Sequence, residues 1–231
     1  MLLLAADTSG KLGSIAVARC EQPSSCEVLG IAALEGGTFS AQLIPQIAGL
    51  LERLGLSKSD LEGFAVVSGP GSFTGLRIGL AAIKALAEIL RKPTAAVSLL
   101  EAVAAAANVK GVNVAGNITA ALDAGRGEIY IGEYATAGAE ANLSSAAHEQ
   151  LCTPEEFLER SSAFVVTPDA IIADFARGAG KQVQQVDRPR ADTIATLGWR
   201  KMQAHILVSP EELEANYIRR TDAELLSKSG S

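Results

Sequence analysis

The residues whose types and spacing could do chemistry in this chain form a glycine-rich stretch at residues 68–79, Ser-Gly-Pro-Gly-Ser-Phe-Thr-Gly-Leu-Arg-Ile-Gly. The stretch follows a short apolar run at residues 64–67 and opens a long run of helical periodicity. Gly69 and Gly71 permit backbone angles that are closed to other residues, and Pro70 stiffens the turn between them. We therefore predict a tight turn that leads into a helix capped by a serine. This motif turn comprises Gly69, Pro70, Gly71, Ser72, Thr74 and Arg77.

A strand, a glycine-rich turn and a helix in this order suggest three kinds of site, and each fits incompletely. A dinucleotide site needs backbone N–H donors and a later acidic residue, but Pro70 removes a donor and no acid ends the apolar run at residues 94–97. A phosphate-binding P-loop needs Gly-Lys-Ser/Thr, whereas residues 75–77 are Gly-Leu-Arg. A nucleophile elbow needs Gly-x-Ser-x-Gly, whereas Ser72 is flanked by Pro-Gly and Phe-Thr. A tight turn with close helix packing is the simplest alternative.

The composition of the chain limits the classes of protein to consider. A length of 231 residues fits one large domain or two lobes. Hydrophobic residues make up 48% and aromatic residues only 4%, so the cores must consist mainly of Ala, Leu, Val and Ile. A net charge of −6 disfavours a chain that binds nucleic acid by itself, because phosphate binding needs a basic face.

Cysteine usage and the N-terminus indicate the cellular compartment. Cys20, Cys26 and Cys152 are an odd set without CxxC spacing, which favours a reduced cytosolic protein. The N-terminus lacks the basic segment of a signal peptide, and no apolar stretch approaches the length of a membrane span. We therefore expect a cytoplasmic protein with no membrane association.

The pattern of apolar residues predicts an α/β fold with two lobes, residues 1–110 and 111–231. In the first lobe we predict strands at 2–6, 13–19, 27–34, 64–67 and 94–97, and helices at 40–54, 73–90 and 99–108. In the second lobe we predict strands at 118–122, 128–135 and 163–166, and helices at 154–160 and 191–206, with a polar tail at residues 211–231.

The two halves show a faint repeat. Each begins with an apolar strand that ends in an aspartate, Asp7 or Asp123, followed by a turn with Gly and a basic residue and then a second apolar strand. Two such hairpins that face each other across a cleft hold Mg²⁺ and phosphates in actin-like and sugar-kinase-like ATPases. Two unrelated hairpins are the alternative.

Four segments together resemble the TsaB (YeaZ) family: residues 3–9, 68–79, 123–130 and 216–219. The similarity is close up to about residue 135 and loose thereafter, apart from the last segment. It implies a two-lobed fold of the actin/Hsp70/sugar-kinase (ASKHA) type. It also implies a non-catalytic partner of the enzyme TsaD in making threonylcarbamoyladenosine at position 37 of tRNA. The resemblance further implies that TsaE, an ATPase, joins the pair, that tRNA binds only within the complex, and that the protein forms a homodimer when alone.

The residues also indicate that catalysis has been lost. In the catalytic relative, the strand after the glycine-rich helix leads into a His-x-x-x-His metal motif, but residues 97–103 contain no histidine. Metal centres need such converging ligands, and the only two histidines, His148 and His205, are expected at the surface. We predict no catalytic residue and no metal site.

Nucleotide binding is also expected to be lost. The glycine-rich adenosine loop of the related ATPases corresponds here to Thr-Pro-Asp at residues 167–169, with residues 178–180 as the other candidate. We predict no cofactor, with a nucleotide at the joint with TsaD as the open alternative. The residues of a degenerate phosphate cleft would be Asp7, Thr8, Ser9, Asp123 and Arg126.

The predicted helix at residues 73–90 is apolar around most of its circumference, and the helix at 40–54 has a similarly broad apolar face. A helix that covers only one sheet usually has a narrower apolar band. We therefore expect both helices to meet a partner's helices in a bundle, with burial inside one chain as the alternative. Small positions would let the helices approach closely. The predicted interface comprises Leu43, Ile47, Leu50, Leu51, Phe73, Gly75, Leu76, Gly79, Leu80 and Ile83.

The function predicted from the sequence is a scaffold that activates TsaD. The alternatives are a weak ATPase of the actin-like fold and a peptidase-like hydrolase. The ATPase hypothesis has carboxylates but lacks the adenosine loop, and the peptidase hypothesis lacks a base near any serine or cysteine.

Overall fold

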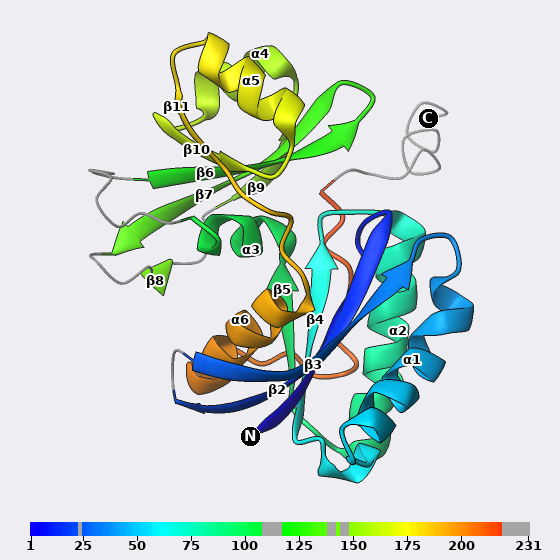
Figure 1. The fold of residues 1–231 in the computed structure, drawn as a ribbon. Coiled ribbons are helices and arrows are strands. Elements are labelled where there is room, and N and C mark those ends of the chain that lie inside the picture. Colours follow the sequence, from blue (N-terminus) through cyan, green and yellow to red (C-terminus); the bar gives the residue numbers. More distant parts are fainter. Residues whose placement is uncertain (23–24, 108–116, 138–141, 144–147, 219–231) are drawn as a thin grey trace, which may run out of the picture.

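The computed structural model of the chain describes residues 1–22, 25–107, 117–137, 142–143 and 148–218, which form two lobes (Figure 1). The N-terminal lobe contains a five-stranded sheet in the order β3-β2-β1-β4-β5. The first three strands pair antiparallel, and β1, β4 and β5 pair parallel. The strands are β1 (Leu2–Asp7), β2 (Leu12–Gln22), β3 (Ser25–Glu35), β4 (Gly63–Gly69) and β5 (Thr94–Ser98).

The C-terminal lobe repeats this topology, with β9-β7-β6-β10-β11 as the equivalent order. Here β6, β7 and β9 pair antiparallel, β6, β10 and β11 pair parallel, and β8 (Asn142–Leu143) pairs with the end of β7. The strands are β6 (Asn117–Gly125), β7 (Glu128–Ala137), β9 (Glu149–Cys152), β10 (Phe164–Thr167) and β11 (Gln182–Gln185). The predicted internal repeat and the two-lobed ASKHA-type fold are therefore confirmed.

The helices cover both sheets and connect the lobes (Figure 1). On the N-terminal sheet, α1 (Phe39–Arg53) and α2 (Phe73–Leu90) pack on one face and α6 (Ala191–Gln203) packs on the other. On the C-terminal sheet, α4 (Pro154–Arg160) and α5 (Ala170–Gly178) lie on one side, and α3 (Leu99–Ala105) contacts β6 and β7. Thus α6, from the C-terminal half of the chain, packs on the N-terminal sheet, and α3, from the N-terminal half, packs on the C-terminal sheet. The boundary predicted at residue 110 lies outside the described residues.

The sequence explains why the central elements form as they do. Every residue of β1 and β4 is buried, as expected for strands covered on both faces. Along α2, Leu76, Leu80 and Ile83 recur at helical spacing and are buried against the sheet. The Ser72 hydroxyl accepts a hydrogen bond from the Gly75 N–H at 3.3 Å and caps this helix as predicted.

The structure corrects several expectations for the second half. Helix α5 and strands β9 and β11 were not predicted, although they complete the second sheet and its cover. Residues 178–180, the second candidate for an adenosine loop, instead form the last residue of α5 and the turn that follows it. The predicted helices at 99–108 and 191–206 end earlier, at Ala105 and Gln203.

The cysteines also differ from the prediction. Cys20 and Cys26 face each other across the β2–β3 pair and form a disulfide bond, so the expectation of a fully reduced chain was wrong for this pair. Cys152 is a buried free thiol. No helix in the part of the chain that the structure describes is long and apolar enough to span a membrane.

Candidate functional site

A cavity of about 860 Å³ lies between the two lobes and gathers the segments that the sequence singled out. The β1–β2 turn and the motif turn line it from the N-terminal lobe, and the β6–β7 turn lines it from the C-terminal lobe. A third wall comes from the end of the described chain, Asn216, Tyr217 and Ile218. The two predicted hairpins therefore do face one cleft.

The β1–β2 turn is packed tightly against α2. The Thr8 hydroxyl donates a hydrogen bond to the Gly75 carbonyl at 2.7 Å. A Cβ atom at Gly75 would lie 2.0 Å from the Thr8 carbonyl oxygen, and one at Gly79 would lie 2.3 Å from Thr8 Oγ1. The groove that these glycines leave on α2 is thus filled by the chain's own turn, and it is not open to a partner helix.

Asp7 does not face the cavity. Its side chain is 2% exposed, and its Oδ1 accepts hydrogen bonds from the Ser9 N–H at 2.8 Å and the Ser9 hydroxyl at 2.6 Å. Burial raises the pKa of the Asp7 carboxyl, against the opposing effects of the Ser9 hydrogen bonds and the Arg188 charge. Asp7 Oδ1 therefore holds the turn together, and Asp7 is not among the residues that line the cavity.

Asp123 occupies the equivalent place in the second lobe but is exposed and lines the cavity. Its Oδ1 accepts the Gly125 N–H at 2.8 Å, and its own N–H donates to Asp169 Oδ2 at 2.8 Å. Of the five predicted cleft residues, Ser9, Asp123 and Arg126 line the cavity, while Asp7 and Thr8 lie behind its wall.

The charged lining of the cavity is mixed. Lys11, Arg126 and Arg188 contribute positive charge, and Asp123 and Asp169 contribute negative charge. No group of three or more His, Cys, Asp or Glu side chains converges anywhere in the described residues. His148 and His205 are both exposed, as the sequence predicted.

The motif turn and the first turn of α2 contact Tyr217, in a segment to which the sequence analysis gave no structural role. The Arg77 guanidinium carbon lies 3.9 Å from the centre of the Phe73 ring, and its Nε donates to the Tyr217 hydroxyl at 3.0 Å. The Phe73 and Tyr217 rings lie 4.9 Å apart between centres. Thr74 is exposed beside this cluster. Tyr217 belongs to a segment without helical or strand periodicity, so no local pattern predicted this contact.

The structure buries nine of the ten predicted interface residues inside the chain, and only Phe73, at 36%, is exposed. The predicted residue list was therefore wrong for these nine, because the largest apolar side chains of both helices point into their own lobe. The buried set comprises Leu43, Ile47, Leu50, Leu51, Gly75, Leu76, Gly79, Leu80 and Ile83.

The outer face of α1 and α2 carries a different set of residues, most of them small or apolar. Ile44 is 50% exposed and Ile89 is 74% exposed. We call this set the α1–α2 outer face, and it comprises Ala41, Ile44, Pro45, Ala48, Arg77, Ala81, Ala85 and Ile89.

Comparison with protein families gives one match over most of the chain. The model of the family described as "TsaD: tRNA N6-adenosine threonylcarbamoyltransferase" matches residues 36–206. The tRNA threonylcarbamoyladenosine biosynthesis protein TsaB of Haemophilus influenzae is 30% identical over 167 residues, which are 69% of this chain and 67% of that protein. TsaB of Bacillus subtilis is 37% identical over 134 residues. That match covers 58% of this chain and spans only 55% of the Bacillus protein.

A solved structure supports the fold independently. A crystal structure of a Pseudomonas aeruginosa protein, described as uncharacterized and similar to peptidase YEAZ, superposes with a TM-score of 0.73. The two chains are 25% identical, and the superposition covers 94% of this chain and 99% of that one.

Proposed function

The chain belongs to the TsaB (YeaZ) family, and on this premise we propose that it is a non-catalytic partner of TsaD in the synthesis of threonylcarbamoyladenosine in tRNA. The observation that carries the proposal is the internal use of the N-terminal cleft residues. Asp7 accepts two hydrogen bonds from Ser9, and Thr8 is bonded to Gly75. A nucleotide-hydrolysing site needs such groups directed at its ligand.

The α1–α2 outer face is the surface that we assign to TsaD. It is rich in exposed alanine and isoleucine, and small residues allow a second pair of helices to approach closely. The same face would join two copies of the chain when TsaD is absent. TsaE would join once the pair has formed. The tRNA would also bind only to the assembled complex, because the net charge of −6 gives this chain no general affinity for RNA. We place the complex in the cytoplasm.

We assign no cofactor to the isolated chain, and the two enzymatic alternatives are weaker. An ATPase would use the mixed charges of the cavity, but the stretch at residues 167–169 connects β10 to α5 and contains no glycine loop. A peptidase would need a base beside a nucleophile, and no histidine of the described residues lines the cavity.

The proposal is tested by reconstitution. TsaD, TsaE, a threonylcarbamoyl-adenylate source and tRNA are mixed with and without this protein, and modified adenosine is measured. We expect modification to depend on this protein, whereas the isolated chain should not turn over Mg-ATP in calorimetric titration. Turnover of ATP by the isolated chain, or modification that proceeds equally without it, would overturn the proposal.

The assigned surface is tested with a matched pair of exposed isoleucines. Ile44→Glu places a charge on the α1–α2 outer face, and Ile171→Glu places the same charge on α5, where Ile171 is 86% exposed. We expect the first variant to weaken TsaD binding by at least about 10-fold and the second to leave it unchanged, with native circular dichroism for both. Full binding by folded Ile44→Glu would exclude this face.

A further inference from the structure

The end of the described chain, residues 208–218, runs along the N-terminal lobe from the edge of β5 to the motif turn, with a tight turn at residues 210–212. Its first residue donates a backbone hydrogen bond from Val208 N to the Thr94 carbonyl at 3.0 Å, at the edge of β5. Leu213 is buried in the core, and the Lys84 ammonium donates to the Glu211 carbonyl at 3.3 Å. We call residues 208–218 the C-terminal strap.

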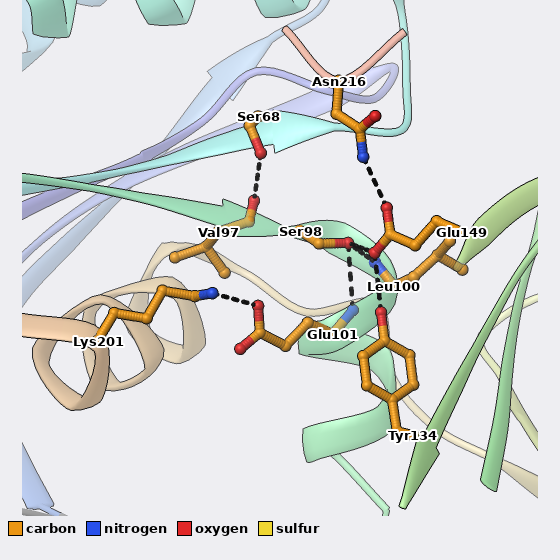
Figure 2. A network of polar contacts seen from close by, with 9 residues as sticks. All are labelled: Ser68, Val97, Ser98, Leu100, Glu101, Tyr134, Glu149, Lys201 and Asn216. Carbon is orange, nitrogen blue, oxygen red and sulfur yellow. Dashed lines mark hydrogen bonds and ion pairs between the residues drawn. The ribbon is translucent and has the colours of Figure 1, made fainter. Parts of the chain in front are cut away.

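The strap ends at the joint between the lobes. The Asn216 N–H donates to the Ser68 carbonyl at 2.7 Å, beside the motif turn. The Asn216 side chain points the other way, and its Nδ2 donates to Glu149 Oε2 at 2.8 Å (Figure 2). Glu149 opens β9 in the C-terminal lobe, so this bond joins the strap to the opposite lobe.

Glu149 collects donors from three separate parts of the chain (Figure 2). Its Oε1 accepts the Tyr134 hydroxyl of β7 at 2.9 Å and the Ser98 hydroxyl at the end of β5. Ser98 Oγ already accepts the N–H groups of Leu100 and Glu101 at 3.1 Å and 3.4 Å, so its hydrogen is directed to Glu149. One carboxylate therefore bonds the N-terminal lobe, the C-terminal lobe and the strap.

We propose that the C-terminal strap is a displaceable wall of the cavity, held in place by Glu149, and that this carboxylate fixes how far the two lobes stand apart. The strap supplies three lining residues of the cavity but has only one side-chain bond to the C-terminal lobe among the described residues. Toward the N-terminal lobe, its last residues are held by the backbone bond from Asn216 to Ser68 and by the exposed Arg77–Tyr217 contact. Loss of the Glu149 bond therefore frees the end of the strap from the C-terminal lobe and opens the cavity on that side.

In the Asn216–Glu149 bond the amide donates and the carboxylate accepts, so a pair of substitutions can exchange the two roles. Asn216→Asp sets a carboxylate against Glu149 and replaces the donor with an acceptor, so the end of the strap should detach from the C-terminal lobe. Adding Glu149→Gln reverses the pair, because the introduced amide N–H₂ would donate to the introduced carboxylate of the strap. The amide oxygen would still accept from Ser98 and Tyr134. Gln182→Glu, an exposed amide-to-acid change on β11, is the matched control.

Two measurements on the isolated chain decide the outcome. Hydrogen exchange of residues 213–217 should become at least about 10-fold faster in Asn216→Asp, return to the original rate in the double variant and stay unchanged in Gln182→Glu. The distribution of distances between spin labels at Glu52→Cys on α1 and Glu159→Cys on α4 should broaden in Asn216→Asp. It should return to its original width in the double variant and stay unchanged in Gln182→Glu.

Unchanged exchange and an unchanged label distance in folded Asn216→Asp would overturn the proposal. If that variant does not fold, a folded double variant supports the proposal and an unfolded one counts against it. Because TsaD takes no part in these measurements, their result is independent of the proposed function.

Discussion

The two lobes share one strand order yet treat the aspartate at the end of their first strand in opposite ways. Asp7 and Asp123 each accept the N–H of the residue two positions later, at 2.8 Å in both lobes. Asp7 is nevertheless sealed inside the protein, whereas Asp123 is exposed to the cavity. The local turn is therefore the same, and the difference must come from the elements packed around it.

The segment after the fourth strand of each sheet accounts for the difference. In the N-terminal lobe, glycines on α2 let the helix backbone reach Thr8, and this contact covers the β1–β2 turn. In the C-terminal lobe, α5 begins after Asp169, whose carboxylate accepts the Asp123 N–H and stands between helix and turn. Glycines at the start of the helix thus close one side of the cleft, and a polar side chain at the same place leaves the other side open.

The lobes also differ in their covering helices. The helices α1 and α2 have 15 and 18 residues, whereas α4 and α5 have 7 and 9. The longer pair buries a full apolar face and still has an outer face rich in alanine and isoleucine. This asymmetry is why we assign partner binding to the N-terminal lobe.

The largest effect that would test this comparison is expected from a charge on the inner face of α2. Ile83 is 0% exposed, so Ile83→Glu would bury an unpaired carboxylate and should destabilise the fold by more than about 4 kcal/mol. Ile171→Glu on the corresponding helix of the C-terminal lobe should cost less than about 0.5 kcal/mol. Urea denaturation measures both values, and a cooperative, native-like Ile83→Glu would show that α2 does not pack as described.

A pair of glycine substitutions addresses the closed side of the cleft. Gly75→Ala would place a Cβ 2.0 Å from the Thr8 carbonyl oxygen and should cost about 3 kcal/mol, because backbone atoms must move. Gly178→Ala near the end of α5 would meet no atom within 4 Å and should be neutral or slightly stabilising. The free energy of unfolding of the two variants gives the comparison directly. Equal values would mean that the glycine groove does not position the β1–β2 turn.

The sequence predicted much of the N-terminal lobe because its elements are long and their signals are local. The bounds predicted for α2, residues 73–90, match the structure, since a serine cap and a left-handed residue at Arg91 delimit a strongly periodic run. In the second half, β11 is Gln-Val-Gln-Gln and becomes a strand only by pairing with β10. Helix α5 was missed although Ile171, Ile172 and Phe175 have helical spacing.

The candidate site was predictable only in part. The repeat indicated correctly that the two hairpin turns face one cleft, because both belong to the same strand position. The sequence could not show that Asp7 turns away from that cleft, because its burial depends on α2. It also gave no sign of the contacts of Glu149 and Tyr217, which join segments 67 and 140 residues apart.

The pH dependence of stability offers a smaller test of the two aspartates. Burial raises the pKa of Asp7, so the native state binds a proton more readily than the unfolded chain does. The stability of the protein should therefore fall as the pH rises from the unfolded value of 3.8 through the raised native value. Asp7→Asn should remove that part of the pH dependence, as measured by urea denaturation across this range. Asp123→Asn serves as the matched variant, and an identical flattening there would contradict the assignment to Asp7.

The smallest effect is expected on thiol reactivity, which compares the cysteine of β3 with the cysteine of β9, the equivalent strand in the other lobe. Cys26 of β3 is bonded to Cys20, whereas Cys152 of β9 is a buried thiol whose pKa burial raises to about 11. At pH 8 only roughly one molecule in a thousand would carry the Cys152 thiolate. A thiol reagent should therefore label the native protein very slowly, count one thiol after denaturation and count three after denaturation with reductant. A count of three thiols without reductant would show that Cys20 and Cys26 are reduced. Rapid labelling of the native protein would show that Cys152 is not buried beside β7, the strand with which β9 pairs.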